Sequence, residues 1–431
     1  MAKNLGLKEL IAIAIGGMVG GGIFTILGIS VSMVGFLAPF AIALGGIVAL
    51  FAAYSYVKLG VYYKDEGATY AFFKRTFPKS HLAASVIGWY TIFGYISTLA
   101  LYAYTFSSYG ISGSEFANNE IFRKVVAIAI IWIFALINIW SVKGMGRLED
   151  LMVYLKLIIL FIISIMLINY GKVDFNTFSN MVTKDFSNTS FLNILVVSSV
   201  TFVAYEGFQL VINAVKEMDN PTANIPKAIY TAVAIVALIY FIISLASVVA
   251  IRVDDLIKNK EYALANGARD AIGLWAQNLV IFGAILATSS AISGTMFGSS
   301  RQMSRIADDG YLPKILTKRV GTIPKNAIIS MALTATTLIL IGGLRLILEF
   351  GSITFLLVSL LMAIANFKIR DKTNSSTLFT LISILGLLIG SSLILWYEYK
   401  TKPEQMFFIL VIYAILTIGA FFYSKFAKFN L

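Results

Sequence analysis

The sequence predicts an all-α integral membrane protein with twelve transmembrane helices, in a five-plus-five inverted repeat whose helices 1 and 6 are broken. Of the 431 residues, 58% are hydrophobic and only 13% are charged, and the mean hydropathy is +0.84. Apolar stretches of ~20 residues, long enough to cross a bilayer as a helix, recur along the chain and leave no separate soluble domain.

We place the twelve helices on the apolar stretches between the charged segments. Their expected ranges are 7–32, 36–59, 82–110, 123–142, 150–170, 191–216, 226–251, 273–303, 324–343, 347–367, 377–397 and 405–424. Within a single membrane domain, we expect residues 1–170 to form the first repeat, residues 191–367 the second, and residues 377–424 a peripheral pair of helices.

The distribution of charge orients these helices. An even number of helices leaves both termini on one side of the membrane. If that side is cytoplasmic, it carries 22 of the 34 basic residues and fewer than half of the 22 acidic ones, as the positive-inside rule requires. We therefore expect a multi-pass protein of the cell membrane with both termini in the cytoplasm. The net charge of +12 then reflects topology and does not indicate a nucleic-acid partner.

The first expected helix contains five glycines among the seven residues from Gly16 to Gly22. Each glycine in a helix interior costs about 1 kcal/mol relative to alanine, so the cluster predicts a break at mid-membrane. Broken backbone at that depth is tolerated only where it is buried in protein or lines a wet cavity. The N–H groups that open the second half-helix would then suit an anion. Close packing of helices through small residues is the alternative interpretation.

Lys156 lies in the fifth expected helix, six residues beyond Asp150. At ~1.5 Å per residue, its Cα lies several ångströms below the membrane surface. Ionisable residues at such depth are functional candidates, although a lysine can also extend its ammonium group back to the surface. An ammonium group here would repel Na⁺, and in a low dielectric it can release its proton. Lys156 is therefore a candidate for proton coupling.

The sixth expected helix repeats the pattern of the first. Glu206 follows Tyr205 and precedes Gly207 in an apolar segment, and it is the only acidic residue that we place inside a helix. Five helices separate the two interruptions, and an odd repeat length inverts the second copy. Paired interruptions in two halves of a chain indicate a transporter binding site. Glu206 could bind substrate, hold unwound backbone, or pair with Lys156.

Several classes of function are excluded by composition. The chain has no cysteine and one histidine, His81, which lies at the expected membrane edge and is either a proton shuttle or an ordinary surface residue. A membrane enzyme would need His, Cys or paired acids within the helices. A scaffold would not need paired broken helices. We therefore expect no enzymatic activity, no metal and no cofactor.

Four strings of residues, in order along the chain, resemble signatures of the amino acid–polyamine–organocation (APC) transporters. The string Gly16–Phe24 resembles the signature of the family's first helix. The strings Phe202–Phe208 and Glu217–Pro226 resemble its sixth helix and the loop that follows on the inner side. The string Asp308–Pro313 resembles a motif after its eighth helix. The resemblance covers at least the first ten helices.

The resemblance implies transport of an amino acid across the cytoplasmic membrane by alternating access. The substrate carboxylate would bind N–H groups of the first break, its ammonium group would face carbonyls freed by both breaks, and Phe202 would close over it. The candidate substrate-binding residues are Met18, Gly20, Gly21, Gly22, Phe202, Tyr205, Glu206 and Phe208. Two departures from the family are that a hydroxyl is frequent at the position of Gly21 and that the position of Glu206 is often uncharged.

The resemblance also implies a coupling site. Lys156 matches the fifth-helix lysine of proton-coupled, archaeal-type members, where its ammonium group replaces a sodium ion. Its partners would be carbonyls of the first helix and a hydroxyl of the eighth, Ser289 or Ser290, although hydroxyls in lipid usually bond to their own helix. We expect protons, an amino acid and lipid as partners, a monomer or weak oligomer, and no dependence on sodium. An amino acid exchanger and a polyamine or organic-cation carrier are the alternatives.

Overall fold

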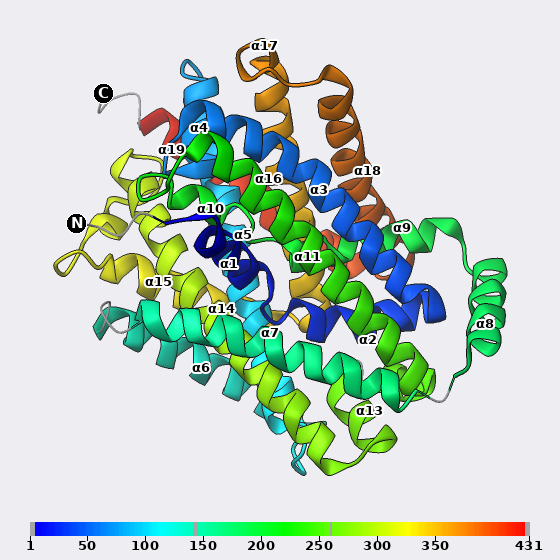
Figure 1. Cartoon of the computed structure of the whole chain (residues 1–431). Helices are drawn as coiled ribbons and strands as arrows, with labels where there is room; N and C mark the ends of the chain where they lie inside the picture. Colours follow the sequence, from blue (N-terminus) through cyan, green and yellow to red (C-terminus); the bar gives the residue numbers. More distant parts are fainter. Residues whose placement is uncertain (1–4, 141–144, 172, 259–260, 427–431) are drawn as a thin grey trace.

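The computed structural model describes residues 5–140, 145–171, 173–258 and 261–426, and the side chains of these residues except 145–150 and 426. In these ranges the chain forms helices joined by short turns (Figure 1), and its β pairing consists of two isolated bridges, Leu5 with Met218 and Val320 with Ile323. The prediction of an all-α protein is therefore confirmed.

Each expected helix overlaps a helical segment of the structure. The α-helices are α1 (Leu7–Met18), α2 (Gly22–Val34), α3 (Ala38–Tyr63), α4 (Ala68–Thr76), α5 (His81–Ile111), α6 (Glu120–Trp140), α7 (Met145–Asn169), α8 (Phe175–Asn188), α9 (Phe191–Val200), α10 (Leu210–Asn213), α11 (Pro221–Ala250), α12 (Val253–Lys258), α13 (Ala263–Ala271), α14 (Leu274–Asp308), α15 (Lys325–Ile341), α16 (Leu344–Lys368), α17 (Arg370–Thr373), α18 (Thr377–Thr401) and α19 (Pro403–Phe426). Three 3-10 turns are η1 (Gly35–Leu37), η2 (Thr201–Tyr205) and η3 (Lys314–Thr317). The last two residues expected in the fourth helix, 141 and 142, lie outside the described residues.

Nine helical segments of the described chain are long and apolar enough to cross a membrane. One of them, Gly22–Tyr63, joins α2, η1 and α3, and α15 is a shorter apolar helix. The chain is therefore a multi-pass membrane protein, and the count of twelve crossings stays a prediction.

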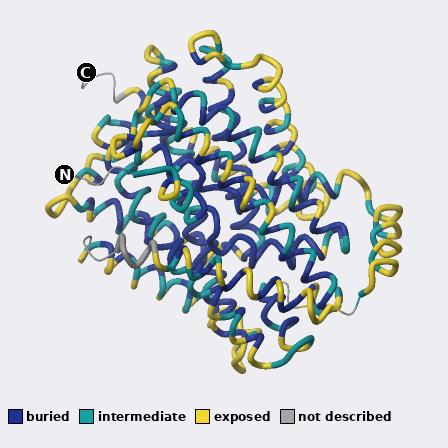
Figure 2. The backbone as a smooth tube through the Cα atoms, in the orientation of Figure 1, coloured by how far each residue is buried: buried dark blue, intermediate teal, exposed yellow. Residues whose placement is uncertain are grey.

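The broken segments lie among long helices near the middle of the molecule. The segment α1–α2 contacts α11, α14 and α7, while α9 and η2 contact α3 and α16. In Figure 2, buried backbone fills this central region, and exposed residues mark the periphery. The last two long helices are the most exposed, since only 33% of the most apolar stretch of α18 and 22% of that of α19 are buried. This exposure fits a peripheral pair.

Two helical additions lie outside the long helices. α8 stands at one side of the molecule (Figure 1) and has no buried residue. It is tied to the bundle through Asp185, whose carboxylate accepts a hydrogen bond of 2.8 Å from the N–H group of Phe36. α13 lies at the end opposite α4 (Figure 1) and packs against α14 and α2. The apolar pattern alone did not indicate α8, because its sequence is mostly polar.

Candidate transport site

The first break occurs at the glycine cluster. α1 ends at Met18 and α2 begins at Gly22, and the first hydrogen bond of α2 runs from the N–H group of Thr25 to the carbonyl of Gly21, over 3.2 Å. The preceding N–H groups of a helix have no partner within it. The expected interruption is thus present, with N–H groups at the start of the second half.

The second break lies directly against the first. The 3-10 turn η2 follows α9, and the chain is extended at Glu206 before α10 begins at Leu210. Gly207 has a φ of +125°, a conformation that favours glycine, and a Cβ there would lie 2.4 Å from the carbonyl carbon of Gly17. A Cβ on Gly22 would likewise lie 2.6 Å from that of Ala204. Both interpretations of the glycine cluster therefore hold, because the glycines break the helix and also let the two breaks touch.

A tyrosine of α11 joins the two breaks. The hydroxyl of Tyr240 is fully buried and lies 2.9 Å from the carbonyl of Met18 and 3.2 Å from that of Ala204. We expected the Met18 carbonyl to face the substrate ammonium group, but this carbonyl accepts a hydrogen bond from Tyr240 instead. Sequence reasoning missed Tyr240, since a tyrosine in an apolar helix is otherwise an unremarkable core residue.

Lys156 is fully buried on α7 and donates a hydrogen bond of 2.9 Å from Nζ to the carbonyl of Gly16 in α1. The ammonium group therefore points to the first broken helix and is shielded from solvent. α14 also packs against α7. On α14, Ser290 is buried and Ser289 is partly buried, so the hydroxyls named by the resemblance lie on a neighbouring helix.

Glu206 faces a small cavity next to the breaks. The carboxylate is 3% exposed, and neither of its oxygens accepts a hydrogen bond within the described ranges. The cavity has a volume of about 20 Å³, which is room for about one water molecule. It is lined by Gly17, Tyr95, Thr98, Tyr102, Glu206, Gly207, Leu210, Asn213, Thr295, Gly298, Ser299, Gln302 and Phe355. An amino acid would fit only if the surrounding helices moved apart.

None of the three glycines of the predicted carboxylate site lines this cavity, and only Gly20 lies next to a residue of its wall. A Cβ on Gly20 would be 2.9 Å from the ring of Tyr102, a residue of the cavity wall. A Cβ on Gly21 would be 3.1 Å from the hydroxyl oxygen of Thr105. That hydroxyl is also 2.6 Å from the hydroxyl of Thr25. α5 thus supplies a hydroxyl close to Gly21, the position at which the resemblance led us to expect one.

The aromatic candidates of the sixth helix do not line the cavity. The hydroxyl of Tyr205 donates a hydrogen bond of 2.7 Å to the carbonyl of Ile42, and the ring of Phe208 packs 5.4 Å from that of Tyr56. Both partners belong to α3, so these two side chains anchor the break to a neighbouring helix. Phe202 is fully buried within η2 and is also absent from the cavity wall.

The expectation that Glu206 is the only acid within a helix is wrong. Glu349 in α16 is 1% exposed and Glu398 in α18 is fully buried. Arg345 lies 2.7 Å from an oxygen of Glu349 and 3.2 Å from one of Glu398. Glu349 lies two residues into the expected helix 347–367 and Glu398 lies one residue beyond the expected helix 377–397. Ion pairing with arginine permits the burial of both acids.

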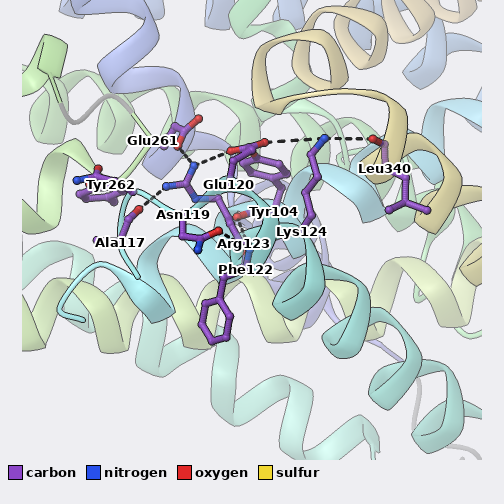
Figure 3. Close-up of polar contacts among 12 residues, drawn as sticks. Tyr104, Ala117, Asn119, Glu120, Phe122, Arg123, Lys124, Glu261, Tyr262 and Leu340 are labelled. Carbon is purple, nitrogen blue, oxygen red and sulfur yellow. Dashed lines mark hydrogen bonds and ion pairs between the residues drawn. The ribbon is translucent and has the colours of Figure 1, made fainter. Parts of the chain in front are cut away.

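A second polar cluster lies where α5 and α6 meet the segment before α13 (Figure 3). Arg123 is 4% exposed, forms ion pairs with Glu120, at 3.0 Å, and with Glu261, and donates a hydrogen bond of 2.5 Å to the carbonyl of Ala117. Tyr104 of α5 donates a hydrogen bond of 2.5 Å to Glu120. These contacts fasten α6 to α5 and to the α12–α13 segment.

The string Asp308–Pro313 and His81 meet at the other end of the molecule. Asp309 accepts hydrogen bonds from Tyr70, at 2.8 Å, and from Lys74, at 2.9 Å, both of which belong to α4. Nδ1 of His81 lies 2.9 Å from the hydroxyl of Tyr311. His81 is therefore held by a neighbouring loop and lies far along α5 from the cavity-lining residues.

Comparison with known proteins agrees with this architecture. The family model described as amino acid permease matches residues 5–429. The chain is 29% identical to the inner membrane transport protein YbaT of Escherichia coli, over 91% of this chain and 93% of that protein. It is 26% identical to the mouse large neutral amino acids transporter small subunit 2, over 100% of this chain and 83% of that protein. An uncharacterized protein of Methanocaldococcus jannaschii is 26% identical, over 99% and 96% of the two chains. The chain is a transporter and not an enzyme, and it belongs to the amino acid permease family of the APC superfamily.

Proposed function

We propose that this protein moves amino acids across the cell membrane by alternating access, coupled to protons and independent of sodium. The observation that carries the proposal is the buried ammonium group of Lys156, 2.9 Å from the carbonyl of Gly16 beside the first break. A built-in cation repels Na⁺ from the same place. Because burial opposes the charged form, the group can lose its proton when its surroundings change. A lysine that alternates between charged and neutral forms can couple proton movement to the opening of α1.

The fold that supports this mechanism has twelve crossings in two inverted repeats. Residues 1–170 form the first repeat, residues 191–367 the second, and residues 377–424 a peripheral pair, with both termini in the cytoplasm. The direct contact between the two breaks supports the pairing of the repeats, because a Cβ on Gly17 would be 3.0 Å from the carbonyl oxygen of Gly207. The exposure of α18 and α19 supports their place outside the repeats.

The substrate carboxylate binds N–H groups around Gly20, Gly21 and Gly22, at the start of α2. The positive end of the helix dipole attracts the carboxylate, and Thr105 adds a hydroxyl beside Gly21. The ammonium group of the substrate faces carbonyls of η2 and the cavity that Glu206 lines. Phe202 acts as the gate. Since the cavity has a volume of only about 20 Å³, the structure represents a conformation closed to substrate, and α1 and α10 separate from α5 and α14 when the site opens.

The position of Glu206 supports a positively charged substrate for the same transporter. Its carboxylate faces the cavity and accepts no hydrogen bond from the described residues. A buried carboxylate without a partner is unstable in the charged form. A second ammonium group, on a cationic amino acid or a polyamine, would satisfy it. Competition by compounds with and without an α-carboxylate, against one transported label, distinguishes the two kinds of cargo.

Uptake into sodium-free proteoliposomes tests the coupling. We expect wild-type uptake to follow an imposed pH gradient and to be unchanged when Na⁺ is added. Lys156→Arg should fail, because a guanidinium group does not release its proton. Lys425→Arg, on the exposed end of α19, is the matched control and should transport normally. Full pH-dependent uptake by Lys156→Arg would overturn the coupling role.

A further inference from the structure

A second cavity, far larger than the first, opens on the side of the bundle between α3, the start of α11 and the α17 region. Its volume is about 750 Å³, a size typical of small-molecule sites. It is lined by Tyr54, Val57, Lys58, Val61, Tyr62, Lys64, Thr222, Pro226, Tyr230, Lys372, Thr373 and Asn374. We call it the basic pocket.

All the charged residues that line the basic pocket are positive. Lys58, Lys64 and Lys372 line it, no acidic residue does, and none of the three forms an ion pair in the part of the chain that the structure describes. The acids next to Lys64 in sequence are engaged elsewhere, since Asp65 lies 2.5 Å from Arg75 and Glu66 lies 2.7 Å from Lys216. The pocket therefore offers ammonium groups to an anion.

Two of the pocket residues are fixed by hydrogen bonds. Lys58 donates a hydrogen bond of 2.7 Å to the carbonyl of Asn374, and its Nζ lies 5.7 Å from the centre of the Tyr54 ring. The hydroxyl of Tyr54 accepts a hydrogen bond of 2.7 Å from the N–H group of Ser376. An ammonium group has three donors, so Lys58 keeps donors for a ligand while its position is set by the loop after α17.

An apolar strip of α3 leads away from the basic pocket. Phe40, Ile47 and Tyr54 are seven residues apart, so they share one helix face, and the end of that face carries Lys58. Phe40 is 44% exposed and Ile47 is 49% exposed, in a helix that crosses the membrane. Figure 1 shows α3 passing between α11 and α18, and α3 contacts both helices. A basic pocket at the end of a lipid-facing apolar strip matches a ligand with an anionic head and a hydrocarbon tail.

We propose that the basic pocket binds the phosphate headgroup of an anionic phospholipid, with its acyl chains along α3. Basic pockets between transmembrane helices suit such headgroups, which are attracted by lysines at the membrane surface. The pocket lies at the end of the molecule that holds the N-terminal segment, because Leu5 is hydrogen-bonded to Glu217 and Asp219, just before α11. With the termini in the cytoplasm, as proposed above, the lipid belongs to the inner leaflet.

Lipid retention by the purified full-length protein tests the proposal. Native mass spectrometry after exchange into detergent with phosphatidylglycerol or phosphatidylcholine measures the number of bound lipids and their affinity. We expect wild-type protein to retain phosphatidylglycerol preferentially. Joint replacement of Lys58, Lys64 and Lys372 by glutamine should weaken that binding roughly tenfold or more. Retention equal to wild type would overturn the proposal.

A matched variant controls for the loss of three charges. Lys79, Lys314 and Lys318 are exposed and do not line the pocket. They lie after α4 and after α14, two regions that Asp309 joins through its hydrogen bonds with Tyr70 and Lys74. Joint replacement of the three exposed lysines by glutamine should change phosphatidylglycerol binding less than about twofold. An equal loss in both triple variants would show nonspecific attraction and would also overturn the proposal.

Two further measurements address folding and the source of the phosphate. Because Lys58 also holds the Asn374 carbonyl, the variant Lys64→Gln with Lys372→Gln keeps that contact and should still bind phosphatidylglycerol more weakly than Lys79→Gln with Lys318→Gln. Glycerol 1-phosphate should displace the lipid poorly, since it lacks the acyl chains. If glycerol 1-phosphate displaced the bound lipid at the same concentration as phosphatidylglycerol does, the pocket would be a site for soluble phosphates. That result would refute a lipid site.

Discussion

Removing the Tyr240 hydroxyl tests whether the contact between the two breaks governs substrate binding. Tyr240→Phe deletes one oxygen from a fully buried side chain and leaves the ring contact with Tyr205, at 5.3 Å, in place. The carbonyl of Met18 keeps a second donor, the N–H group of Gly20 at 2.9 Å. The carbonyl of Ala204 loses the Tyr240 donor at 3.2 Å. The perturbation is therefore confined to the hydrogen bonds between α11 and the two breaks.

The expected loss of stability is about 1–3 kcal/mol, the effect of leaving a buried acceptor without its partner. If the breaks must be held together to bind substrate, affinity should fall by a factor of about 5 to 150, which is that free energy expressed as a binding constant. Thermal unfolding and substrate binding, both measured on detergent-purified protein, give the two quantities.

Tyr413→Phe is the matched control. Tyr413 is 8% exposed, and its hydroxyl lies 2.8 Å from that of Thr354, between α19 and α16. Neither residue lines the cavity. We expect a similar loss of stability with unchanged substrate affinity. Unchanged affinity in Tyr240→Phe, together with a normal loss of stability, would refute the argument that this hydroxyl organises the binding site.

Three further variants examine the proposed substrate site. Gly21→Leu should abolish substrate binding while the protein still reaches the membrane, because its side chain would fill the space beside Thr288 and Thr105, 3.0 and 3.1 Å from a Cβ; near-normal affinity would contradict the carboxylate site. Phe202→Ala should lower affinity and slow exchange, with a loss of stability smaller than the 3–5 kcal/mol typical of a core aromatic; a large loss with intact transport would make Phe202 a core residue. Glu206→Gln should weaken cationic substrates more than neutral ones in competition assays, and an equal loss for both would exclude a role in charge recognition.

The sequence by itself determined the long apolar helices and the position of the two breaks. These properties are local. Apolar length sets whether a segment can cross the membrane, and clustered glycines weaken a helix wherever they occur. The break between Met18 and Gly22 therefore lies where the glycines predicted it. The sequence left open whether the ammonium group of Lys156 extends to the surface, and its burial against the carbonyl of Gly16 is seen only in the structure.

Only the tertiary structure decided which way the side chains of the broken segments point. Outside a regular helix no fixed period relates sequence position to direction, so the turn of Tyr205 and Phe208 toward α3 depends on contacts with that helix. The buried Glu349 was overlooked for a similar reason, because its burial depends on Arg345, which also pairs with Glu398 in another helix. The hydrogen bond from Tyr240 to Met18 joins residues 222 positions apart, and no local pattern of apolar or charged residues encodes a contact made only when the chain folds back on itself.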